Sequence, residues 1–136
     1  MNDLPSKRLG IETFPNRNIR VFHVNTEVFL TISGWRHGYN SQLDSQRRIG
    51  NQNKLLVNEL LAIEGVVHVG LERHEISVEV GSVYLWKELQ DKIIEKILQR
   101  FSWKKEETAI MSMHDFLIYA ERHDQATIPA DLVPDR

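Results

Sequence analysis

The chain has 136 residues, of which 41% are hydrophobic and 26% charged, and its formal net charge is −2. This length and composition are typical of one soluble globular domain with its own hydrophobic core. The small net charge excludes a global field that would attract nucleic acid or an anionic membrane. The absence of cysteine excludes disulfides, thiolate nucleophiles and thiolate metal sites on this chain.

The first residues lack the features of a targeting signal. Asp3 and Glu12 are acidic, Pro5 comes early, and no apolar h-region follows. No apolar run approaches the roughly 18 residues that a membrane span requires. We therefore expect a protein of the cytoplasm or an organelle matrix, without a signal peptide or transmembrane segment.

The first third of the chain predicts one hairpin and one long loop. Residues 1–17 are polar and contain two prolines, which predicts an irregular arm. Residues 18–24 and 27–33 are rich in β-branched and aromatic side chains and flank a turn signal, which predicts two paired strands. Residues 33–52 are rich in Gly, Asn, Gln and Ser, and loops of this length are functional or disordered.

The middle of the chain predicts a helix and a second hairpin. Leu56, Leu60 and Ile63 share one face of a helix over residues 52–63, and Gly65 suits the left-handed position that follows a helix. Alternating apolar residues then predict strands on either side of a turn at residues 73–74. The side chains expected to face the core are Val67, Val69, Leu71, Ile76, Val78 and Val80, and those expected on the other side are His68, Ser77 and Glu79.

Two more helices are predicted near the C-terminus. An apolar stripe at three- and four-residue spacing covers residues 83–101, and a shorter one covers residues 112–123 with Ser112 as its N-cap. The predicted order is β-β-α-β-β-α-α. This order predicts an α+β domain of two layers, with a mostly antiparallel four-stranded sheet and the helices packed on one face. The domain proper spans residues 18–101, and residues 102–136 add an extra helix and an extended tail.

Residues 12–101 resemble the N-terminal domain of Nfu-type (NifU-like) iron–sulfur cluster scaffold proteins. The shared features are a helix that ends in AIEGV, a hairpin that opens with V-x-x-V, an I-S-V strand, and a Trp followed three residues later by Leu. An upstream Pro-Asn pair leads into the first strand, as in that family. The positions that carry this fold signature are Pro15, Asn16, Gly65, Val66, Ile76, Val78 and Trp86.

The resemblance implies a role as well as a fold. In the scaffolds a separate C-terminal domain carries the Cys-x-x-Cys ligands of the cluster, and this sequence contains no cysteine. The resemblance therefore implies a protein-interaction module that is accessory to iron–sulfur cluster assembly or delivery, with any cluster held by a partner. None of the signature positions has a catalytic role to pass on.

The candidate chemical groups are weaker signals. His68 and His74 are six residues apart across a turn, which is not a recognised metal-ligand spacing, so we expect surface histidines and no metal or cofactor. A metal-binding domain built on the histidines remains a third interpretation. The sequence has no Gly-x-Ser-x-Gly motif and no phosphate-binding glycine loop, and we expect no enzymatic activity.

The loop over residues 33–52 is the candidate binding surface. Its aromatic and cationic side chains suit a protein hot spot and also single-stranded nucleic acid, although the overall charge disfavours nucleic acid. Another interpretation is that Trp35 and Tyr39 cover the sheet while the arginines are solvated. The proposed contact residues are Trp35, Arg36, His37, Tyr39, Arg47 and Arg48.

Two functional hypotheses follow from this sequence. The first is a non-catalytic adaptor that binds a protein partner, in the setting that the resemblance implies. The alternative is a small structural subunit of a larger protein or ribonucleoprotein assembly, which contacts its neighbours through the loop at residues 33–52 and the extension at residues 102–136. The sequence predicts no oligomeric state.

Overall fold

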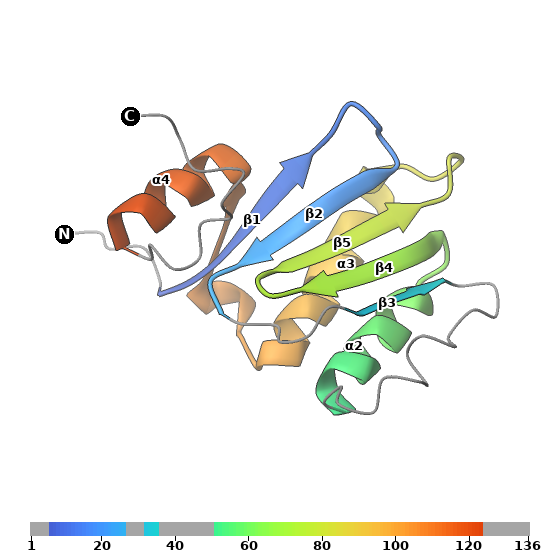
Figure 1. Cartoon of the computed structure of the whole chain (residues 1–136), viewed down its shortest axis with the longest axis horizontal. Helices are drawn as coiled ribbons and strands as arrows, with labels where there is room; N and C mark the ends of the chain where they lie inside the picture. The colour runs from blue at the N-terminus through green and yellow to red at the C-terminus, as the bar shows by residue number, and fades with distance from the viewer. Residues whose placement is uncertain (1–5, 27–31, 36–50, 124–136) are drawn as a thin grey trace.

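The computed structural model describes residues 6–26, 32–35 and 51–123, and it contains one six-stranded sheet flanked by helices (Figure 1). The strands lie side by side in the order β3-β4-β5-β2-β1-β6. The elements are β1 (Lys7–Thr13), β2 (Ile19–Val24), β3 (Ile32–Trp35), α2 (Asn51–Leu61), β4 (Val66–Glu72), β5 (Glu75–Val80), α3 (Trp86–Phe101), the 3₁₀ turn η1 (Lys105–Glu107), β6 (Thr108–Ser112) and α4 (Met113–His123).

The sheet confirms the predicted α+β class and corrects the predicted strand count. Neighbouring strands are antiparallel except for β1 and β6, which run parallel. The sequence predicted four strands, and two of the six arise in segments that were assigned to an arm and to a break between helices. Both additional strands lie together at one edge of the sheet, where β1 pairs with β2 on one side and with β6 on the other.

The prediction of an irregular N-terminal arm is wrong, because residues 7–13 form β1. Leu9 and Ile11 alternate with Gly10 and Glu12, so one side of the strand is apolar and faces the core. β1 is the antiparallel partner of β2. This pairing takes the place of the predicted hairpin between residues 18–24 and residues 27–33. β3 overlaps the last two residues of that predicted second strand, continues into the predicted loop and pairs with β4. Residues 27–31 lie outside the described residues.

The main core lies between one face of the sheet and the helices α2 and α3, which Figure 1 shows behind the strands. Phe22 and Val24 of β2 are fully buried there, together with the predicted apolar stripe of α2 and that of α3. Burial of each such side chain contributes roughly 1.5–3 kcal/mol. The core residues from the two helices include Leu56, Val57, Leu60, Ile93, Ile97 and Leu98.

A β-bulge in β4 changes which valine enters the core. The register between β4 and β5 shifts between Val66 and His68, so one extra residue is inserted on β4. As a result Val66, and not the predicted Val67, is fully buried with Val69. A bulge cannot be read from an alternating pattern, because it reverses the pattern at one point.

α4 packs on the face of the sheet opposite α2 and α3, which corrects the prediction that all helices share one face. Phe116 of α4 lies 6.1 Å, centroid to centroid, from the ring of His23, and it covers Gly10 of β1. His23 follows Phe22 on β2 and therefore points to the other side of the sheet. Ser112 caps the helix as predicted, since its Oγ accepts a hydrogen bond of 3.2 Å from the Asp115 N–H.

α3 begins at Trp86, three residues later than the stripe predicted. The Leu85 N–H donates to Glu88 Oε1 over 3.2 Å, which supplies an acceptor for one of the orphan donors at the helix start. Val83, at 83% exposure, lies in the preceding loop. Among the described residues, no helix is both long enough and apolar enough to span a bilayer.

Candidate functional site

A groove of about 340 Å³ lies between α3 and β6. Its apolar walls are Ile94 and Leu98 of α3, Trp103 and Ile110. Its polar rim consists of Gln90, Asp91, Lys92, Glu95 and Lys105. The groove opens at the edge of the sheet, where β6 is the last strand of the described order.

The C-terminal end of α3 places Trp103 in the groove. Ser102 adopts the left-handed conformation with φ 58° and ψ 35°, and its N–H donates to the Gln99 carbonyl over 3.1 Å. The Trp103 N–H donates to the Leu98 carbonyl over 2.9 Å. These two bonds form a Schellman motif, in which the residue after the left-handed position packs back on the last turn of the helix. Trp103 and Leu98 are therefore neighbouring parts of one wall.

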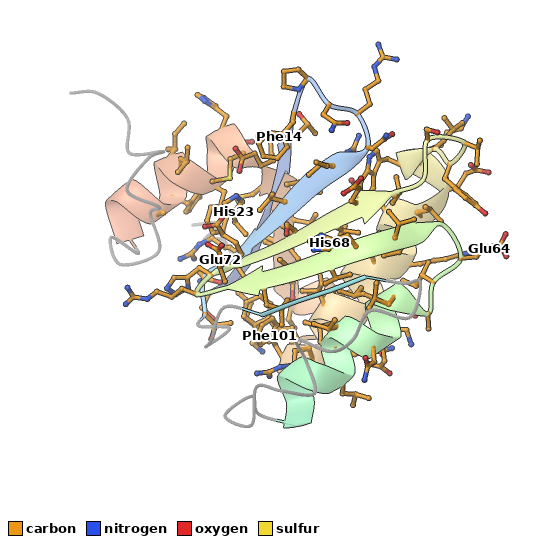
Figure 2. The ribbon with its side chains drawn as sticks, turned by 45° about the vertical axis from the view of Figure 1, so that its right-hand side comes forward. Phe14, His23, Glu64, His68, Glu72 and Phe101 are labelled. Atoms are coloured by element: carbon orange, nitrogen blue, oxygen red, sulfur yellow. The ribbon has the colours of Figure 1, made fainter. Side chains whose placement is uncertain are left out.

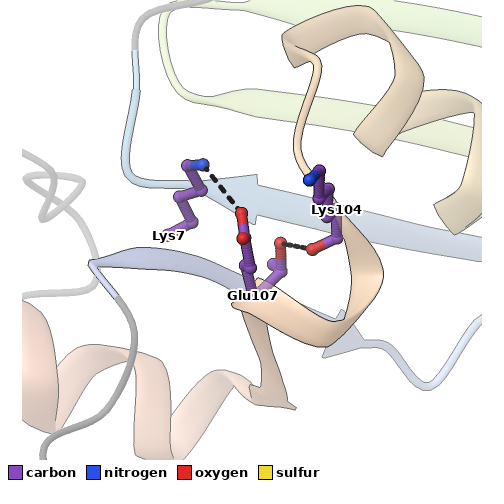
Figure 3. Close-up of polar contacts among 4 residues, drawn as sticks. Lys7, Lys104 and Glu107 are labelled. Atoms are coloured by element: carbon purple, nitrogen blue, oxygen red, sulfur yellow. Dashed lines mark hydrogen bonds and ion pairs between the residues drawn. The ribbon is translucent and has the colours of Figure 1, made fainter.

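The turn η1 leads from Trp103 into β6, and two polar contacts hold the start of that strand (Figure 3). The Thr108 hydroxyl donates to the Lys104 carbonyl over 2.8 Å, and Lys7 Nζ lies 3.6 Å from Glu107 Oε1. Thr108 is buried, whereas the two ion-pair partners are substantially exposed. The hydroxyl bond therefore contributes more to this corner than the surface ion pair does.

β6 supplies the edge of the groove. Ile110 is opposite Leu9 in the parallel register, so it points to the same side of the sheet as the main core. It is 37% exposed because no described strand follows β6 on its outer side. An edge strand of this kind presents backbone N–H and C=O groups that can pair with another extended segment.

The charges around the groove are balanced. Asp91 and Glu95 are acidic, Lys92 and Lys105 are basic, and all four side chains are exposed. Arg20 of β2 helps to position the remaining rim residue, since its Nη1 donates to Gln90 Oε1. Its guanidinium also lies 5.1 Å from the ring centroid of Trp86, and burial lowers its pKa.

The groove has the chemistry of a binding surface. Its titratable lining residues are Asp91, Lys92, Glu95 and Lys105, and all four are exposed. In the described part of the chain, no group of three or more His, Asp or Glu side chains is placed to hold a metal ion. Apolar walls with a charge-balanced rim are suited to enclosing apolar side chains.

A second polar cluster joins His23 and Glu12, and no pattern in the sequence indicated it. His23 Nε2 lies 2.7 Å from Glu12 Oε1, and the histidine is fully buried against Phe116. Its Nδ1 atom is buried without a hydrogen-bond partner. The pair is a diagonal contact between β1 and β2. It could be found only by assigning residues 7–13 to a strand.

The two histidines considered for a metal site do not share a site. His68 is opposite Glu79 in the sheet register, and the ring of His74 bonds at Nδ1 to the Thr26 carbonyl over 2.9 Å. Burial lowers the pKa of His68, and the nearby Glu79 charge offsets part of that effect. Figure 2 shows His68 on the sheet, apart from His23 beside α4.

The predicted contact loop falls almost entirely outside the described residues. Arg36, His37, Tyr39, Arg47 and Arg48 lie in the undescribed range 36–50. Trp35 is the last residue of β3, and its backbone is paired with His68 in the antiparallel register. The structure therefore describes one residue of the predicted contact set, at the end of β3.

The fold-signature residues lie in the turns and the core. Pro15 and Asn16 form the β1–β2 turn, and Val66, Ile76 and Val78 are fully buried. Gly65 has a φ of +104°, and a Cβ there would stand 2.9 Å from the Tyr84 ring. The Trp86 indole donates to the Arg17 carbonyl over 2.6 Å, which ties the β1–β2 turn to α3.

Comparison with known proteins gives no family for this chain. No family model matches it, and no curated protein matches it. Among solved structures, it is similar to the protein SAV1430 from Staphylococcus aureus. The identity is 15% and the TM-score 0.49, over 66% of this chain and 98% of that one. At this distance the neighbour carries no argument about function.

Proposed function

We propose that this chain is a non-catalytic protein-binding module, and that its docking surface is the groove between α3 and β6. The observation that carries the proposal is an apolar groove of about 340 Å³ beside an exposed edge strand. Ile110 contributes to both features, since it lines the groove and is 37% exposed. Partially exposed apolar residues surrounded by a polar rim are typical of protein interaction sites.

The balanced rim supports a protein partner over nucleic acid. Two acidic and two basic side chains line the groove, and a phosphate backbone would meet repulsion from Asp91 and Glu95. The resemblance of residues 12–101 to the Nfu N-terminal domain adds an expected setting, which is iron–sulfur cluster assembly or delivery. In that setting the partner would hold the cluster, because this chain has no thiolate.

In the alternative of a structural subunit, the loop at residues 33–52 and the extension at residues 102–136 contact the neighbouring chains. Residues 105–123 instead build η1, β6 and α4, and β6 and α4 pack on the domain's own sheet. This part of the extension therefore stabilises the domain that carries it. The same segment supplies Trp103, Lys105 and Ile110 to the groove, so a neighbour that contacts these side chains would meet this surface.

The test is site-specific photo-crosslinking in the native cells. A photoreactive phenylalanine analogue at position 110 is expected to crosslink one partner, and the same analogue at the highly exposed position 83 is not. The purified partner should then bind the wild-type protein and the Val83→Lys control with equal affinity. Ile110→Lys should bind at least about tenfold more weakly, because the charge would be buried in an apolar contact.

A further inference from the structure

We propose that the partner binds as an extended strand added to the outer edge of β6, with alternate apolar side chains in the groove. This inference rests on the proposed function and specifies the conformation and chemistry of the bound segment. Strand addition is one of the recurring ways in which a protein recognises a peptide, because the backbone supplies affinity and alternate side chains supply specificity.

The first argument is the composition of β6. Natural edge strands are blunted by charges, prolines or bulges that prevent pairing with another chain. The sequence of β6 is TAIMS, which contains no charge and no proline, and its pairing with β1 is regular over all five residues. The charged residues Lys104 to Glu107 precede the strand and do not interrupt it.

The second argument is the coincidence of the edge with the groove. A strand added beside β6 would place its own side chain next to Ile110 on the same face, at a Cβ separation of about 4.5–5.5 Å. On that face the neighbours are Leu98, Ile94 and Trp103. The added side chain would therefore enter the groove, and the residues before and after it would point to the opposite face.

The opposite face of β6 is also compatible with an apolar segment. Ala109 and Met111 alternate with Ile110 and are half-buried. An incoming strand would thus meet apolar side chains on both faces and only uncharged residues along the edge. The volume of about 340 Å³ is at the lower end of the range of about 300–1,000 Å³ for ligand pockets. This favours a few aliphatic or aromatic side chains over a large folded element.

The experiment uses the partner segment that crosslinks to position 110, made as a synthetic peptide of about twelve residues. Two sets of variants carry N-methyl groups on alternate backbone nitrogens. Strand addition predicts that one set, whose N–H groups face β6, loses affinity about tenfold or more, while the other set binds like the parent peptide. An even loss in both sets, or none in either, would overturn strand addition.

The outcomes separate the two proposals. A crosslink at position 110 with no alternation in the N-methyl series leaves the groove as the docking surface and removes the strand. No crosslink at position 110 removes the docking surface itself. A concentration-dependent dimer that Ile110→Lys abolishes and Val83→Lys preserves would mean that a second copy of this chain occupies the edge, and would overturn the partner strand.

Discussion

Gly10 of β1 lies directly under Phe116 of α4, so that a Cβ on residue 10 would stand 2.5 Å from the Phe116 Cβ. No side chain can be added there unless α4 moves away from the sheet. The close approach allows the Phe116 ring to cover His23 on the neighbouring strand. Gly10 therefore determines how closely α4 can approach the sheet.

Gly10→Ala is expected to lower the free energy of unfolding by about 1–3 kcal/mol, the usual cost of overpacking. Chemical denaturation measures this loss, and hydrogen exchange should show reduced protection of the α4 amides. Gly81→Ala is the matched control, because its Cβ would have an ordinary contact of 3.5 Å with Tyr84. Equal stability of the two variants would contradict the close packing of α4 on β1.

The contact of His23 with Glu12 should contribute more to the free energy of unfolding than an exposed ion pair does. Glu12→Ala removes the partner of a fully buried imidazole nitrogen, and the other nitrogen already has none. We expect a loss of about 1–3 kcal/mol in the free energy of unfolding, measured by urea denaturation. Glu106→Ala, at an exposed position of η1, should change stability by less than about 0.5 kcal/mol. A neutral Glu12→Ala would show that the pair contributes nothing.

Protonation of His68 should make the protein less stable in mild acid. Its pKa is lowered in the folded state by burial, with Glu79 as a partial offset. The unfolded chain, in which His68 has its ordinary pKa of about 6.5, binds the proton more readily than the folded chain does. The free energy of unfolding therefore falls as the pH drops from about 6.5 to the pKa of His68 in the folded state. At pH 8 both states are neutral at this residue, and the contribution vanishes.

Denaturation at pH 8 and at pH 5.5 tests this assignment. His68→Gln should lose less stability on acidification than the wild-type protein, because it removes the imidazole whose pKa is lowered by folding. Glu79→Gln should lose more, because it removes the charge that raises the pKa of His68. An unchanged pH dependence in His68→Gln would refute the assignment.

Ser102→Gly is expected to stabilise the protein by about 0.5–1 kcal/mol. Ser102 has a φ of 58°, a conformation that costs an L-residue energy and costs glycine none. The midpoint of thermal unfolding should rise accordingly. Ser82→Gly, at an exposed position without a positive φ, should not raise it. A decrease for Ser102→Gly would mean that the Schellman turn depends on the serine side chain.

Local signals in the sequence predicted the elements that are stabilised locally. The stripe of α3, the N-cap at Ser112 and the turn glycine at Gly65 all correspond to the observed structure. The β4–β5 hairpin is present for the same reason, since a two-residue turn brings its strands together. In the candidate site, the predicted apolar stripe over residues 83–101 supplies Ile94 and Leu98.

The tertiary structure alone decided the edge of the sheet and therefore the groove. β1 and β6 are almost a hundred residues apart in the chain, and each is a five- to seven-residue segment whose pattern resembles an ordinary loop. Their backbone groups become paired only when the folded chain brings them together. The hydrophobic periodicity of the sequence determined which segments have an apolar face that can be buried. The choice of strand partners, the side of the sheet that α4 covers and the position of Ile110 across the groove from α3 depend on pairing over long range, which periodicity does not encode.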